Sequence, residues 1–290
     1  MTDIREGSIQ ANGIEFATIE AGEGTPVLLL HGFPDNPYTY SAQLDALASN
    51  GYRAVAPYMR GYPPTGPAPD GRYDSVALAG DVAALAGAIG DGEPAYVVGN
   101  DWGAISTYGA MALHPETIRR AVIINVGHPA TFLTTLAHPK QLHHIFHFWF
   151  FQRSELAAGA VRASDFALVD YLWDYWSAPG HDYADHLAQV KRTLEPEGAL
   201  EAGIAYYAAL VDVLSTHPEA AAKIQGRIAT PTLTIFGDHD PPRELSEGEH
   251  VHFDADYRLE IVAGAGHFVH REQADQVNRL ILDWFAGEDR

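Results

Sequence analysis

The sequence predicts an α/β fold, with a mostly parallel central sheet, helices on both of its faces and a helical insert. Three observations lead to this prediction. Short continuous apolar runs, which suit strands buried on both faces, alternate with segments of helical periodicity in the N-terminal part. This alternation stops near residue 128, and residues 130–226 show aromatic-rich helical patterns without a convincing strand. Strand patterns return at 230–237 and 257–264, before a closing helix at 272–285.

The N-terminal elements follow from local patterns. Two alternating segments around Asn12-Gly13 predict a β-hairpin over residues 7–20, because Asn-Gly is a strong signal for a tight turn. Residues 74–90 have apolar residues at helical spacing, with Asp74 or Ser75 as the expected N-cap. A second helix is expected over 102–113. Apolar runs predict the buried strands around these helices, at 26–32, within 52–62, at 95–99 and at 119–125.

The change of pattern also predicts the domain organisation. The simplest account is one α/β domain made of residues 1–128 and 227–290. A helical lid, residues 129–226, would interrupt this domain. A chain of 290 residues is ample for one large core of this kind.

The composition excludes several classes of protein. The net charge of −20 disfavours binding to nucleic acid or to an anionic membrane surface. The absence of cysteine excludes disulfides, thiolate zinc sites and cysteine nucleophiles. No apolar run is long enough to span a membrane, and the N-terminal stretch lacks the apolar core of a signal peptide. We therefore expect a soluble cytoplasmic enzyme, with a homodimer among the alternatives for its oligomeric state.

One short stretch, VVGNDWGA at 97–104, indicates where the chemistry takes place. A Gly-x-nucleophile-x-Gly pattern between a strand and a helix forms a sharp turn that presents the middle residue. That residue is usually serine, but here it is Asp101. In a mostly parallel sheet, ligands bind at the carboxyl ends of the strands, which is where this turn falls. Asp101 is therefore the expected nucleophile.

Four motifs in order make the chain resemble the α/β-hydrolase superfamily over essentially its whole length. They are His31-Gly32-Phe33-Pro34, the turn at 99–103, Asp240 in FGDHD and His267 in GAGH. The order nucleophile, acid, histidine is typical of that fold. The resemblance implies that His267 is the catalytic histidine and Asp240 its acid partner. It also implies that the backbone N–H groups of Phe33 and Trp102 form an oxyanion hole.

An aspartate nucleophile narrows the reaction. A carboxylate is already ionised at neutral pH, and it suits displacement at a saturated carbon that bears a leaving group. The product is an alkyl ester on Asp101, which water activated by His267 then hydrolyses. Relatives built this way are epoxide hydrolases and dehalogenases, and the resemblance implies no cofactor. Asp240 is preferred to Asp238 by the usual Gly-x-x-Asp spacing, and the alternative acid position after 119–125 holds Asn125.

The lid helps to choose between the two reactions. Epoxide opening needs a donor to the ring oxygen, and the chain resembles a branch of epoxide hydrolases that uses a histidine and a tyrosine. The matching residues are His147 in FHFWFFQ and Tyr207 in IAYYAAL. Both also fit a plain reading as core residues, since His147 lies among aromatics and Tyr207 on an apolar helical stripe. His31, Trp149 and Phe150 are the expected substrate contacts. We therefore predict hydrolysis of a small lipophilic epoxide to a diol.

The alternatives are a dehalogenase and a module without catalysis. A haloalkane dehalogenase would hold the halide with the indoles of Trp102 and Trp149, but Phe33 stands where those enzymes often carry asparagine. A binding module would have lost a catalytic residue, and none is missing. His143 and His147 have a spacing that can bind metal on a helix, but no carboxylate or cysteine is near, so we expect no metal. His270 is expected at the surface.

Overall fold

In the computed structural model, residues 3–240, 243–244 and 246–287 are the part of the chain that is described. They contain one sheet in the order β1-β2-β4-β3-β5-β6-β7-β8. β2 pairs antiparallel with both β1 and β4, and the other neighbours are parallel, so the sheet is mostly parallel as predicted. The strands are β1 (Arg5–Ala11), β2 (Ile14–Ala21), β3 (Thr25–Leu30), β4 (Tyr52–Pro57), β5 (Ala95–Asn100), β6 (Ile118–Ile124), β7 (Thr232–Gly237) and β8 (Tyr257–Val262).

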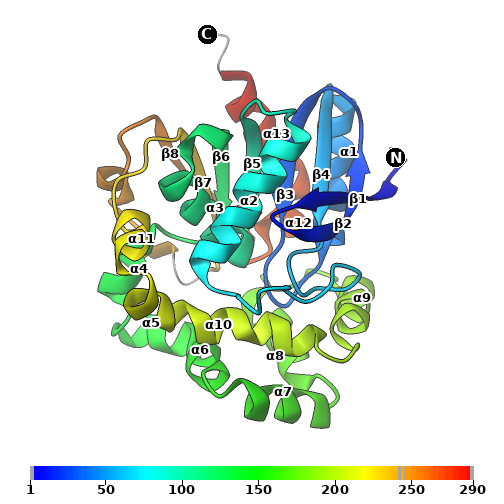
Figure 1. Ribbon diagram of the computed structural model, residues 1–290, viewed down its shortest axis with the longest axis vertical. Helices are drawn as coiled ribbons and strands as arrows, with labels where there is room; N and C mark the ends of the chain where they lie inside the picture. Colours follow the sequence, from blue (N-terminus) through cyan, green and yellow to red (C-terminus); the bar gives the residue numbers. More distant parts are fainter. Residues whose placement is uncertain (1–2, 241–242, 245, 288–290) are drawn as a thin grey trace.

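Helices cover both faces of the sheet (Figure 1). On one face, α1 and α13 pack apolar residues against the strands, and on the other face α2 and α3 do the same. The helices and 3-10 turns outside the segment between β6 and β7 are η1 (Pro37–Tyr40), α1 (Ser41–Ser49), α2 (Ser75–Ile89), α3 (Trp102–Leu113), η2 (Pro115–Thr117), η4 (Glu249–His252), α12 (Val269–Glu272) and α13 (Ala274–Ala286).

The segment between β6 and β7 is helical throughout its described elements, as the sequence predicted. Most of it lies below the sheet in Figure 1, and we call residues 129–226 the cap segment. That it is a domain separate from 1–128 and 227–290 stays a prediction. Its helices are α4 (Pro129–Thr135), α5 (Pro139–His144), α6 (Phe146–Phe151), α7 (Ser154–Ala163), α8 (Ala167–Trp176), α9 (Ala184–Leu194), α10 (Ala199–Thr216) and α11 (Pro218–Ile224).

A third apolar cluster joins the cap segment to the ends of the strands. It brings Phe33 and Trp102 together with cap residues such as Phe151, Trp173 and Tyr207. Burying aromatic side chains of this size removes a large apolar area from water, which is the main force that holds the cap segment in place. Three of the residues predicted from sequence to be functional, Phe33, Trp102 and Tyr207, belong to this cluster.

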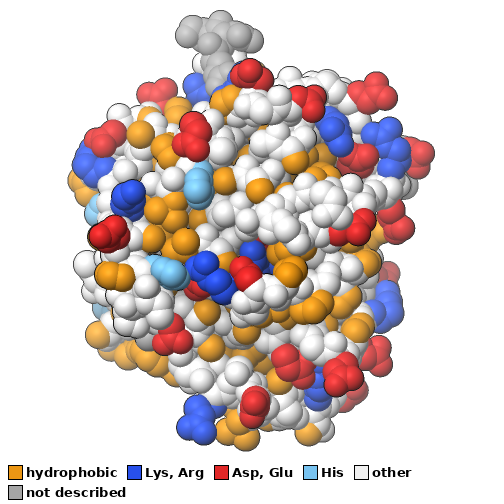
Figure 2. Space-filling view, viewed as in Figure 1, with side chains coloured by type: hydrophobic (Ala, Val, Ile, Leu, Met, Phe, Trp, Pro, Cys, Tyr) orange, Lys and Arg blue, Asp and Glu red, His pale blue; other side chains and the backbone are white. Residues whose placement is uncertain are grey.

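Local signals explain the elements that position the site. β1 and β2 form the predicted hairpin, with Ala11 opposite Ile14 and the turn at Asn12-Gly13. The Asp74 side chain accepts hydrogen bonds from the first N–H groups of α2, which confirms it as the N-cap. In the part of the chain that the structure describes, no helix is long and apolar enough to cross a membrane. Acidic side chains are spread over the surface, as the face in Figure 2 shows.

Candidate active site

Asp101 occupies a sharp turn between β5 and α3. Its φ is +51° and its ψ −117°, a conformation that a residue with a Cβ rarely adopts. The neighbouring backbone leaves no room for side chains: a Cβ on Gly103 would lie 2.0 Å from the carbonyl oxygen of Leu30, and one on Gly32 would lie 2.3 Å from Asp101 Oδ1. The glycines of the turn and of the His31-Gly32 motif therefore let β3 and α3 close around this carboxylate.

Two backbone N–H groups hold the Asp101 carboxylate. The Phe33 N–H donates to Asp101 Oδ1 over 2.8 Å, and the Trp102 N–H is a second donor. Burial raises the pKa of Asp101, and this effect outweighs the opposing influence of His267 and the two N–H groups. The same two donors point to where negative charge would develop on an ester carbonyl of Asp101.

His267 lies between Asp101 and Asp240. Its Nε2 is 3.8 Å from Asp101 Oδ2, and its Nδ1 is 3.7 Å from Asp240 Oδ2. Burial lowers the pKa of His267, but the two carboxylates outweigh burial and raise it above the ordinary value. The structure thus brings together the three residues that the sequence named, in the order carboxylate, imidazole, carboxylate.

Asn125 fixes the loop that carries His267. This residue follows β6, has a φ of +57° and accepts the Gly237 N–H at 3.1 Å through its side-chain oxygen. Its side-chain amide donates to the carbonyl oxygens of Gly266, over 2.9 Å, and of His267. The alternative position for the acid, after β6, therefore holds an amide. This amide links β7 to the loop that carries His267.

His147 and Tyr207 face each other across the cap segment. Their ring centroids are 5.3 Å apart, and both side chains are buried. Burial raises the pKa of Tyr207, and so does the charge of Asp101, which the hydroxyl therefore senses. Burial lowers the pKa of His147 well below its ordinary value, so the ring is neutral at pH 7. Neither the Tyr207 hydroxyl nor His147 Nδ1 has a hydrogen bond of ordinary geometry among the described residues, although the Trp102 indole lies near enough to the Tyr207 hydroxyl to lower its pKa.

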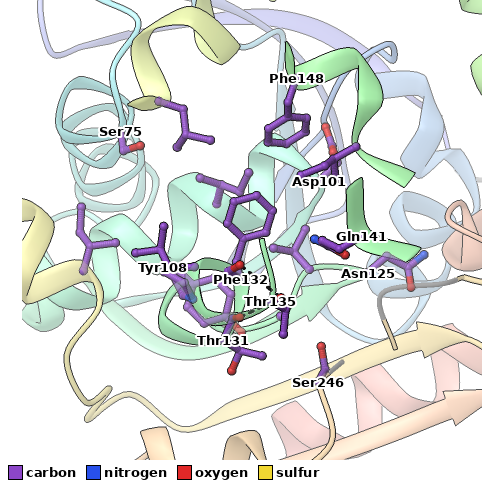
Figure 3. A pocket seen from close by; sticks show the side chains of 18 of the residues that line it. Ser75, Asp101, Tyr108, Asn125, Thr131, Phe132, Thr135, Gln141, Phe148 and Ser246 are labelled. Atoms are coloured by element: carbon purple, nitrogen blue, oxygen red, sulfur yellow. Dashed lines mark hydrogen bonds between the residues drawn. The ribbon is translucent and has the colours of Figure 1, made fainter. Parts of the chain in front are cut away.

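A cavity leads from Asp101 and His267 towards α4, α10 and α11. The centre of a water molecule can occupy about 160 Å³ of it. Figure 3 shows Asp101 and Phe148 at one end and Thr131 and Ser246 at the other. No lysine or arginine is among the described lining residues. The apolar lining consists of Ile105, Val126, Pro129, Phe132, Leu133, Ile145, Phe148, Trp176, Leu210, Val213, Leu214, Ala221 and Ile224.

Three predicted substrate contacts are corrected by the structure. Trp149 is 50% exposed and Phe150 36% exposed, and neither lines the cavity, because both lie on the outer side of α6. His31 is fully buried outside the cavity, where its Nδ1 bonds the Gly32 carbonyl and its Nε2 accepts the Met59 N–H. His31 therefore holds backbone rather than substrate.

Two further expectations concerned histidines: the shared helix of His143 and His147, and the exposure of His270. His143 and His147 do not share a helix, because α5 ends at His144 and α6 begins at Phe146. His270, expected at the surface, is fully buried, and its Nε2 lies 2.8 Å from the hydroxyl of Thr39. The short helix α12 turns this residue inward.

The cap segment also grips the loop that carries Phe33. The Trp173 indole N–H donates to the Pro34 carbonyl over 2.9 Å. His186 Nε2 lies 2.6 Å from Asp35 Oδ1, and both side chains are buried. The position of one donor to Asp101 therefore depends on helices α8 and α9.

Sequence reasoning missed two residues beside His267. Trp176 packs its ring 5.1 Å from that of His267, and its carbonyl accepts the His267 backbone N–H over 2.8 Å. His144 lies with its Nε2 3.9 Å from Asp240 Oδ1. Local spacing could not have found this contact, because a break between α5 and α6 separates His144 from His147 and because Asp240 is distant along the chain.

The fold and this arrangement of carboxylate, histidine and acid define an α/β hydrolase. The chain matches the Alpha/beta hydrolase family over residues 27–280, and it belongs to that family. This confirms the predicted superfamily and fold class.

Individual relatives were found by sequence and by structure. The chain is 29% identical to epoxide hydrolase 4 of Mus musculus, covering 97% of this chain and 79% of that protein. It is 28% identical to the AB hydrolase superfamily protein YfhM of Bacillus subtilis, covering 97% of each. Potato (Solanum tuberosum) epoxide hydrolase I has a similar structure, with a TM-score of 0.82, 24% identity and coverage of 98% of this chain and 100% of that one.

Proposed function

We propose that this chain is an epoxide hydrolase that opens a lipophilic epoxide to a vicinal diol in two steps. The observation that carries the proposal is the Asp101 carboxylate, held by two N–H groups at a cavity that His147 and His267 also line. The names of the relatives that match nearly the whole chain support the same activity.

In the first step, Asp101 Oδ2 attacks one epoxide carbon while the ring oxygen leaves. We assign donation to that oxygen to His147, which lines the same cavity as Asp101, and to Tyr207, which is not among the lining residues but whose hydroxyl senses the charge of Asp101. A proton passes from one of these donors to the alkoxide, and an alkyl ester forms on Asp101. Proton donation of this kind typically contributes roughly a hundredfold or more to the rate.

In the second step, water attacks the ester carbonyl. His267 Nε2 takes a proton from that water, and Asp240 stabilises the imidazolium. The Phe33 and Trp102 N–H groups stabilise the oxyanion. Collapse of the adduct breaks the bond between the carbonyl carbon and Oδ2. Oδ2 leaves with the product and takes the proton of the newly added hydroxyl, so the diol is released and the Asp101 carboxylate is restored. The proton on His267 then restores the donor used in the first step by way of solvent.

The cavity indicates the class of substrate. Its lining is mostly apolar and contains no cation among the described residues, so it suits a neutral lipophilic epoxide. A carboxylated substrate would bury its charge beside Asp101 without a partner, at a large free-energy cost. We expect 1,2-epoxydecane to be turned over at least tenfold faster than its ω-carboxylated analogue; equal rates would contradict this assignment.

The test of the reaction is an ester trap. The His267→Gln variant should react once with styrene oxide and gain the mass of the substrate on the peptide that contains Asp101. The Asp101→Ala variant should gain none. If single turnover in heavy-oxygen water labelled only the diol and never the Asp101 side chain, the two-step scheme would be wrong.

Haloalkane hydrolysis remains the second candidate for one reason. The indole N–H of Trp176 is buried beside the site without a hydrogen-bond partner among the described residues, and the indole N–H of Trp102 has only the Tyr207 hydroxyl near it. Trp176 could thus serve where Trp149 cannot. Incubation with 1-bromobutane and with styrene oxide separates the reactions, since bromide release without diol formation would favour the dehalogenase.

A further inference from the structure

Asp240 lies between two imidazole rings that come from different parts of the chain. Its Oδ2 is 3.7 Å from Nδ1 of His267, and its Oδ1 is 3.9 Å from Nε2 of His144. His267 follows β8, whereas His144 is the last residue of α5 in the cap segment. The carboxylate is buried, and no other described residue gives either oxygen a hydrogen bond. Both distances exceed that of a hydrogen bond, so each ring would have to approach the carboxylate by about 1 Å to form one.

His144 is suited to donate rather than to carry charge. The ring is buried against Tyr175 and Trp176, and its Nδ1 has no described partner. Burial lowers the pKa of His144 to about 4, with smaller contributions from Asp240, which raises it, and from the other nearby histidines, which lower it. A neutral imidazole carries one proton, and at Nε2 that proton faces the carboxylate.

We propose that His144 is a positioning residue that donates its Nε2–H to Asp240 Oδ1 and so reserves Oδ2 for His267. This inference rests on the proposed function. A residue of the cap segment would then hold the acid partner of the histidine that activates water. Its proton stays on His144 throughout, while the proton from water moves to His267.

The proposal separates the two steps of the reaction. Attack by Asp101 on the epoxide needs no proton transfer to His267, so it does not need a well-held Asp240. Ester hydrolysis forms an imidazolium at His267, and its stabilisation needs the Asp240 carboxylate held beside it. Loss of His144 should therefore slow the second step alone.

The experiment compares three variants under single turnover with styrene oxide, using quenched samples and the mass of the Asp101 peptide. His144→Phe removes the donor and keeps a ring. His144→Gln keeps an N–H at the position of Nε2. His143→Phe is the matched control, since this neighbouring side chain is exposed and contacts Tyr175 instead.

We expect His144→Phe to slow ester hydrolysis by roughly tenfold to a hundredfold, the usual effect of losing one hydrogen bond to a charged group. Ester formation should change less than about twofold, and the ester should accumulate. His144→Gln should recover most of the hydrolysis rate, and His143→Phe should match the wild type. Equal slowing of both steps, or of neither, would overturn the proposal.

A measurement on the unmodified protein guards against a variant that fails to fold. Histidine labelled with nitrogen-15 reports which ring nitrogen carries the proton, and His144→Gln assigns the signal. Protonation of Nε2 at neutral pH supports the proposal, and protonation of Nδ1 overturns it. The proposed function has its own test. If no ester forms in His267→Gln, the proposed function is wrong, and the inference about His144, which rests on it, is wrong as well.

Discussion

The Tyr207 hydroxyl should cost the protein stability while it serves the reaction. Its side chain is fully buried, and the hydroxyl has no hydrogen bond of ordinary geometry among the described residues, with only the Trp102 indole near enough to lower its pKa. Burying such a group without a partner costs roughly 1–3 kcal/mol. The ring itself is well packed, 5.0 Å from the rings of Trp102 and Phe151 and 4.8 Å from that of Phe148. Tyr207→Phe therefore removes the unpaired oxygen and leaves the packing intact.

We expect this variant to be more stable and less active. Its free energy of unfolding should rise by about 1 kcal/mol, the lower end of the cost of an unpaired hydroxyl. The rate of ester formation should fall roughly a hundredfold, because a proton donor to the epoxide oxygen is lost while His147 remains. That fall corresponds to about 2.7 kcal/mol of transition-state stabilisation.

The neighbouring Tyr206 is the matched control. It is equally buried, but its hydroxyl donates to the Arg60 carbonyl over 2.7 Å. Tyr206→Phe leaves that carbonyl without its donor, so it should lower stability by about 1 kcal/mol and leave ester formation unchanged.

Two assays decide the outcome. The thermal midpoint should shift upward by about 2 °C for Tyr207→Phe and downward for Tyr206→Phe. Quenched single-turnover mixing with styrene oxide gives the rate of ester formation for each variant. If Tyr207→Phe destabilised the fold and reacted at the wild-type rate, Tyr207 would be an ordinary core residue.

Changes at three further residues have expected results. Burial raises the pKa of Asp101, so its ionised form opposes folding; Asp101→Asn should form no ester and should raise the thermal midpoint at pH 7, with a smaller gain near pH 4. Burial lowers the pKa of His267, but the carboxylates beside it raise it above 6.5, so kcat should fall as the pH drops through that raised value. The protonated ring stabilises the fold below pH 6.5, and this contribution is lost as the pH rises through the raised pKa. The difference in thermal midpoint between the wild type and His267→Gln, measured across pH 5–9, would show this loss. Arg60→Met should destabilise the fold by roughly 3–5 kcal/mol in urea titrations, because it leaves Asp81 buried without its two-point partner, whereas Arg53→Met, at a half-exposed pair, should cost less than about 1 kcal/mol.

The sequence predicted the core elements well because their signals are local. The helix expected at 102–113 is α3, Trp102–Leu113, and the strand expected at 230–237 is β7, Thr232–Gly237. Continuous apolar runs bounded by glycine or proline leave little choice of structure for such segments. The order of Asp101, Asp240 and His267 also needed only the ends of these strands.

The cap segment was harder to predict because its pattern lacks contrast. FHFWFF is apolar at nearly every position, so periodicity could not tell that Trp149 faces outward while Phe151 is buried. The break between α5 and α6, which places His144 on Asp240, has no glycine or proline to mark it. His270 shows the same limit, since its partner Thr39 is distant in sequence.

The contacts between the cap segment and the loop at 33–36 restrict how substrate can enter. If α8 and α9 swung away as one lid, they would pull on Pro34 and Asp35 and displace the N–H that steadies Asp101. At the other end of the cavity, lining residues Leu133 and Leu214 are exposed, and solvent can reach them without any movement of α8 and α9. We therefore expect substrate and product to pass between α4 and α10, while the contacts that hold the loop beside Asp101 stay in place.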